Sequence, residues 1–134
     1  MMRKKKNILL FMTDFYGYHN DIVNEMKNQG WEVTWYQDKV KFSVWESALS
    51  KLSDNHKKKK FMHYFESVLK KEKSNRFDAI LIVFGAGFMT GEHVEKIRMT
   101  FPDTKIVYYA WDSVSNFPAI KSLSEHADVA FSFD

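Results

Sequence analysis

The stretch Asp78-Ala79-Ile80-Leu81-Ile82-Val83-Phe84 carries the strongest β-strand signal in this chain. Its apolar residues are continuous and do not alternate with polar ones, a pattern typical of a strand that is buried on both faces. Strands of this kind occur in parallel sheets whose two faces are covered by helices. The stretch therefore predicts an α/β domain.

Four other apolar runs have the length and composition of strands, and the segments between them have helical spacing. The predicted strands span residues 8–13, 31–36, 78–84, 105–111 and 128–133, and the predicted helices lie at 21–29, 42–76 (two helices), 92–101 and 119–126. The right-handed crossover rule then favours a three-layer, Rossmann-like domain with a five-stranded parallel sheet in the order 2-1-3-4-5. An additional edge strand near residues 39–44 is left open.

The chain of 134 residues has the usual size of one domain. We therefore expect residues 1–134 to form a single Rossmann-like domain. The sequence ends at a strand, with no helix to close the sheet, so it is predicted to be the N-terminal half of a longer two-domain protein. The same uncovered last strand also suggests self-association into a homo-oligomer.

Composition excludes several classes of function. The chain has no cysteine, which excludes disulfides, thiol nucleophiles and zinc ribbons and agrees with a cytoplasmic location. Its five histidines lack the paired spacing of metal ligands, so no metal is expected. The net charge of +3 is concentrated in a basic stretch at residues 57–76.

This basic stretch has two interpretations that stay open, because Phe61, Met62, Tyr64 and Phe65 stand beside its lysines. One is a solvated helix face. The other is peripheral contact with the inner face of an anionic membrane. Nucleic-acid binding is not expected, since no recognised nucleic-acid module surrounds the stretch.

Ligands of open parallel sheets bind at the carboxyl ends of the strands, where the strand order reverses. The loop after the first strand carries two candidate catalytic residues, Asp14 and His19, which could act as a general base. They could equally cap the first helix, as could Asn20 and Asp21. The other candidate binding residues in this loop are Thr13, Phe15, Tyr16, Gly17 and Tyr18.

Two further loops belong to this edge of the sheet. The glycine loop offers Gly85, Ala86 and Gly87, and the end of the fourth strand offers Trp111, Asp112 and Ser113. For each loop the alternative is a purely structural turn. The glycine loop lacks the dinucleotide and P-loop patterns. A receiver-type phosphoacceptor is disfavoured, because the third strand ends at Gly85 rather than at an aspartate.

The order of motifs from Phe77 to Asp134 suggests a family. The motifs are an apolar strand after Phe77-Asp78, then Tyr108-Tyr109-Ala110-Trp111-Asp112-Ser113, and finally Phe131-Ser132-Phe133-Asp134. This part of the chain resembles the N-terminal domain of bacterial GT-B glycosyltransferases of the lipopolysaccharide and capsular polysaccharide type, near the CgeB-like group.

The resemblance implies an acceptor-binding domain of a hexosyltransferase, inactive alone. Its partners would be a saccharide or glycolipid acceptor and, through a missing C-terminal domain, a nucleotide-sugar donor. Asp14 or His19 would deprotonate the acceptor hydroxyl, and no cofactor would be needed. The alternative is a free-standing Rossmann-like or flavodoxin-like module that binds a small molecule or a protein.

Overall fold

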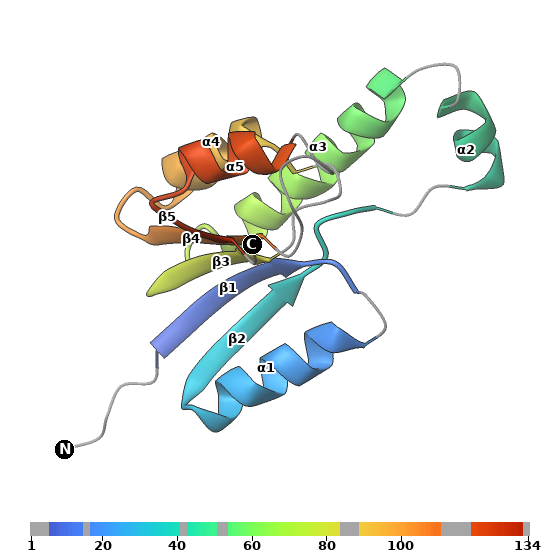
Figure 1. Cartoon of the computed structure of the whole chain (residues 1–134). Coiled ribbons are helices and arrows are strands. Elements are labelled where there is room, and N and C mark those ends of the chain that lie inside the picture. Colours follow the sequence, from blue (N-terminus) through green and yellow to red (C-terminus); the bar gives the residue numbers. More distant parts are fainter. Residues whose placement is uncertain are drawn as a thin grey trace.

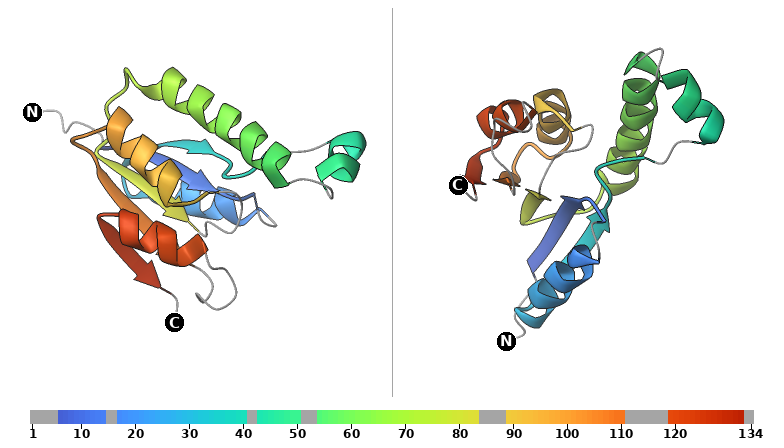
Figure 2. Two further views of the ribbon diagram at one scale, coloured as in Figure 1. Left: turned by 90° about the horizontal axis from the view of Figure 1, so that it is seen from above. Right: turned by 45° about the vertical axis from the view of Figure 1, so that its right-hand side comes forward.

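The computed structural model describes residues 6–14, 17–40, 43–50, 54–83, 89–110 and 119–132. Strands and helices alternate along the chain, as the apolar pattern predicts. Figure 1 shows a sheet with helices on both sides, and Figure 2 shows the same layers from two other directions.

The sheet contains five parallel strands in the order β2-β1-β3-β4-β5, which confirms the predicted fold class and strand order. The central strand β1 is buried over its last five residues, because both of its faces and both of its edges are covered. The strands are β1 (Lys6–Met12), β2 (Trp31–Tyr36), β3 (Ala79–Val83), β4 (Lys105–Ala110) and β5 (Val129–Ser132).

The helices are distributed unevenly between the two faces of the sheet. One face is covered by α3, α4 and α5, whereas α1 lies on the other face, against β1 and β2 (Figure 1). The short α2 packs beside the far end of α3, away from the sheet (Figure 2). The helices are α1 (Tyr18–Asn28), α2 (Val44–Ser50), α3 (Asp54–Glu72), α4 (Gly91–Thr100) and α5 (Ala119–His126).

The larger hydrophobic cluster lies between the sheet and the three helices. Phe61 and Phe65 of α3 are fully buried, and the Phe65 ring lies 5.5 Å from that of Phe11 in β1. His93 of α4 meets the edges of both α3 rings, at centroid distances of 4.9 and 5.0 Å. This aromatic group fixes α3 and α4 over the centre of the sheet.

Two aspartates tie the amino ends of neighbouring strands together. Asp78, just before β3, accepts a hydrogen bond from the backbone N–H of Asn7 in β1 at 2.7 Å. Asp128, just before β5, accepts one from the N–H of Ile106 in β4 at 2.8 Å. That backbone donor, with Arg98 also nearby, lowers the pKa of Asp128. Both carboxylates therefore set strand register at the edge opposite the predicted ligand edge.

The structure differs from the sequence-based expectations at two points. The additional edge strand near 39–44 does not form in the described residues, and Val44 begins α2 instead. The first helix begins earlier than predicted, at Tyr18, after Gly17 with its left-handed φ of 77°, so neither Asn20 nor Asp21 is the N-cap. Helix α3 begins at Asp54 and runs through the lysines, although a lysine run near a helix start is unfavourable for the dipole.

Candidate functional site

The carboxyl edge of the sheet is built around a buried hydrogen bond between the ends of β1 and β2. Thr13 directly follows β1, and its hydroxyl donates to a carboxylate oxygen of Asp38, two residues after β2. Asp38 is fully buried. A buried carboxylate requires hydrogen-bonding partners, so this contact joins the two strand ends firmly.

The charge of Asp38 also acts on two tyrosines of the helix-rich face. Burial raises the pKa of Tyr108 to about 12, and the nearby Asp38 carboxylate adds to the shift. The pKa of Tyr64 is raised by the same two causes, while its hydroxyl donates to the Gln37 carbonyl at 2.9 Å. Sequence reasoning missed Asp38. Its position just past a strand, at the carboxyl edge, was the signal that could have found it.

Asp14 and His19 are brought together as a pair. His19 Nδ1 lies 2.8 Å from Asp14 Oδ1, and the imidazole stacks on the Trp35 ring at a centroid distance of 4.1 Å. Trp35 in turn donates its indole N–H to the Met12 carbonyl at 2.9 Å. The histidine is buried, whereas 46% of the Asp14 side chain is exposed. The pair and Trp35 join the start of α1 to β1 and β2, and the Asp14 carboxylate remains partly accessible to solvent.

This contact, together with the stacking on Trp35, can hold the imidazole in one orientation. Thr13 is the adjacent hydroxyl, but it is engaged with Asp38. Gly17 and Tyr18 lie at the start of α1, and Tyr18 is half exposed. The remaining predicted site residues lie outside the described part of the chain: Phe15, Tyr16, Gly85, Ala86, Gly87, Trp111, Asp112 and Ser113. Their roles, and those of Asp14 and His19, stay predictions.

Metal ligation and membrane insertion find no support in the described residues. In that part of the chain no three His, Asp or Glu side chains are grouped to hold a metal ion. Nor is any described helix both long and apolar enough to cross a bilayer.

The structure argues against the expected membrane contact of residues 57–76. The apolar residues beside the lysines point into the molecule: Phe61 and Phe65 are fully buried, and Tyr64 is bonded to Gln37. These rings form the core of the helix-rich face and are not available to a lipid surface. The stretch thus lacks the exposed apolar side that peripheral helices bury in a membrane.

Comparison with known proteins gives a likeness in fold alone. No family model and no curated protein sequence matches the chain. The chain is similar to a response regulator from Burkholderia pseudomallei, crystallised with a phosphorylated aspartic acid, calcium and citrate, at 14% identity and a TM-score of 0.58. That match covers 96% of this chain but only 60% of the other.

Two further structures involve the response regulator TrrA of Thermotoga maritima. The regulator bound to Mg²⁺ and BeF matches at 18% identity and a TM-score of 0.59, over 96% of this chain and 87% of that chain. Its complex with the histidine kinase ThkA matches at 16% identity and a TM-score of 0.57, over 96% and 86%.

These findings overturn the glycosyltransferase interpretation. The similar structures are receiver domains, and none is a polysaccharide enzyme, so the saccharide or glycolipid acceptor, the nucleotide-sugar donor and the self-associating partner are not supported. The motifs misled for a physical reason. The aspartate of Phe77-Asp78 accepts a hydrogen bond from a strand N–H group, a role that any parallel sheet can give to such a residue.

Proposed function

We propose that this chain is a receiver-like module that binds a partner protein and does not accept a phosphoryl group at the end of its third strand. Fold alone does not determine function, so the proposal rests on the site. The observation that carries it is the sequence after β3: residues 79–102 contain no aspartate, where a receiver-type phosphoacceptor would stand.

The two carboxylates that the structure describes at this edge, Asp14 and Asp38, are engaged in contacts of their own. Asp38 is fully buried and bonded to Thr13, so it is not accessible to a phosphoryl donor. Asp14 is paired with His19. These two carboxylates thus hold the described part of the edge together, which supports a role in binding rather than in phosphoryl transfer. A deprotonating role for Asp14 or His19 toward a sugar hydroxyl is withdrawn with the glycosyltransferase.

The test is incubation with acetyl phosphate and Mg²⁺, followed by intact-mass spectrometry, with a receiver domain that autophosphorylates as the positive control. We expect no phosphorylated species of this chain under conditions that modify the control. A stoichiometric, hydroxylamine-sensitive adduct that disappears in Asp14→Asn would overturn the proposal, because it would identify an acyl phosphate on Asp14.

A further inference from the structure

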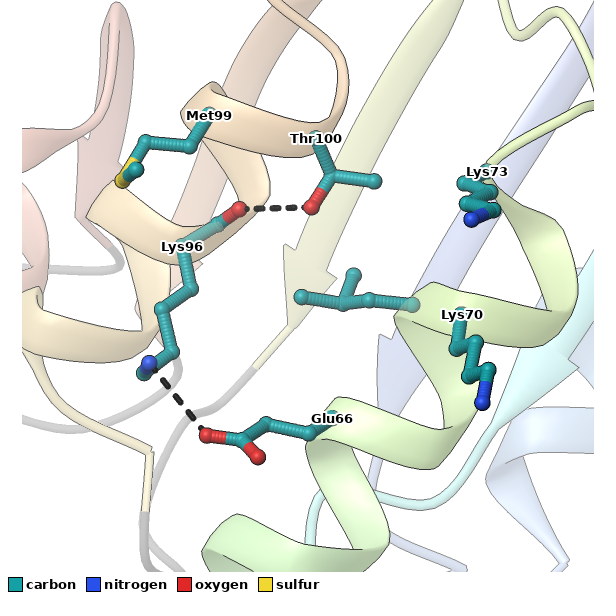
Figure 3. A pocket seen from close by; sticks show the side chains of 7 residues that line it. Glu66, Lys70, Lys73, Lys96, Met99 and Thr100 are labelled. Carbon is teal, nitrogen blue, oxygen red and sulfur yellow. Dashed lines mark hydrogen bonds and ion pairs between the residues drawn. The ribbon is translucent and has the colours of Figure 1, made fainter.

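A groove of about 350 Å³ runs between α3 and α4 on the outer side of the helix-rich face. Figure 3 shows side chains from both helices around it. The groove is distinct from the carboxyl-edge site, because none of its lining residues belongs to the loops after β1, β3 or β4. Its lining consists of Glu66, Leu69, Lys70, Lys73, Lys96, Met99 and Thr100.

The lining has an excess of positive charge. Lys96 Nζ lies 3.3 Å from Glu66 Oε1, so the only acidic side chain of the lining is already paired with one of the three lysines. Lys70 and Lys73 have no carboxylate within ion-pair distance in the part of the chain that the structure describes. In Figure 3 these two lysines stand on the α3 side, whereas Lys96 comes from α4. The groove therefore favours an anionic occupant.

The same groove also has apolar side chains in its lining. Met99 of α4 is 83% exposed and belongs to the groove lining, and in Figure 3 its side chain extends from α4 on the side away from α3. Leu69 of α3 is almost fully buried and contributes apolar surface to the lining. A methionine is adaptable in shape and is common at surfaces that accept other side chains. An occupant gains most here if it brings a large apolar side chain together with its acidic groups.

We propose that the α3–α4 groove binds an acidic segment of a partner protein that places an apolar side chain against the apolar lining formed by Leu69 and Met99. Charge complementarity selects the acidic residues, and a cleft between two helices suits a short helical or extended peptide. The inference rests on the proposed function in that it gives a location for partner binding. It also assigns a task to Lys70 and Lys73, which the solvated-face interpretation of the basic stretch did not.

The experiment uses the full chain and a fluorescein-labelled peptide, DDELEEFLDD, titrated by fluorescence anisotropy at low salt. The groove variant is Lys70→Glu/Lys73→Glu. Its matched control is Lys58→Glu/Lys59→Glu, which changes the net charge equally on the same helix at exposed positions outside the groove. Circular dichroism and a thermal melt establish that both variants are folded.

We expect saturable binding that the groove variant weakens by at least about tenfold and the control by less than about twofold, since contact pairs matter more than net charge. Met99→Ala should weaken binding by about three- to tenfold through lost apolar contact. A peptide with alanine in place of its leucines and phenylalanine should bind the chain more weakly by a similar factor.

Equal weakening by the two double variants would overturn the inference, because it would indicate general charge attraction. Absence of saturable binding would overturn it as well, as would groove-dependent binding to phosphatidylserine vesicles without peptide binding. The outcome is independent of the acetyl phosphate test. A chain that is phosphorylated yet binds the peptide in the groove would overturn the claim that it accepts no phosphoryl group, and would leave partner binding and this inference standing.

Discussion

The two faces of the sheet differ in how completely they are covered. The face under α3, α4 and α5 contains the larger cluster, in which Phe11, Phe65 and Tyr108 are all fully buried. On the other face, α1 covers β1 and β2, with Ile22 and Val23 packed near Leu10 and Met12.

Over β3, β4 and β5 this second face is less protected. Parallel register places Phe131 of β5 beside Tyr109 of β4, and both side chains point to the α1 side. Phe131 is 55% exposed. Within the described residues, no helix lies over this half of the sheet (Figure 1). This difference implies that most of the free energy of unfolding comes from the face covered by α3, α4 and α5.

The largest effect is expected from Phe65→Ala, at the centre of the helix-rich face. The side chain is fully buried against Phe11, Phe61 and His93, so its loss leaves a cavity. We expect a loss of about 3–5 kcal/mol in the free energy of unfolding. Urea denaturation followed by circular dichroism measures it, and a loss below about 1 kcal/mol would contradict the assigned importance of this face.

His93 should make the same face sensitive to acid. Burial lowers its pKa from 6.5 to about 4, with Lys96 adding to the decrease and Glu92 opposing it. Between pH 6.5 and about 4, the unfolded chain therefore binds a proton at His93 that the folded chain does not. Stability is complete above pH 6.5 and declines as the pH falls toward 4, by roughly 2–3 kcal/mol in all.

The measurement is urea unfolding at several pH values, compared with His93→Gln. Glutamine can keep the contact with the Thr90 backbone N–H that the capping-box geometry provides, but it does not titrate. The decline between pH 6.5 and 4.5 should be much shallower in this variant. If the free energy of unfolding falls as steeply with pH in His93→Gln as in the unaltered chain, titratable groups other than His93 cause the decline.

Thr13→Val tests the junction of the strands at the carboxyl edge. It removes a hydrogen bond to the buried Asp38 carboxylate while keeping the side-chain shape. Hydrogen bonds to charged groups contribute about 1.5–3 kcal/mol, and we expect a loss in this range. Thr13→Ser retains the hydroxyl and should recover most of it in the same denaturation assay.

The smallest effect is expected from Phe131→Ser, on the less protected half of the α1 face. Since most of this side chain is already in contact with water, the loss should be no more than about 0.5 kcal/mol. A loss that approaches the one for Phe65→Ala, measured by thermal and urea unfolding, would mean that the two faces are covered equally.

The candidate site was predicted only in part. The pairing of Asp14 with His19 could be anticipated, because both residues lie in one short loop after a central strand. The Thr13–Asp38 contact could not, since it joins residues 25 positions apart whose meeting depends on β1 and β2 being neighbours. The aspartate before β3 was interpreted as part of a family motif, although its partner in β1 gives it a structural role.

The strands, most of the helices and the strand order of the sheet could be predicted from the sequence alone. These depend on local apolar runs, and the crossover rule leaves few ways to connect them. Only the tertiary structure decided which of the polar residues are buried, which lysines of α3 face α4, and which face of the sheet is better covered. Those properties depend on contacts between segments distant in the chain, which no local pattern encodes.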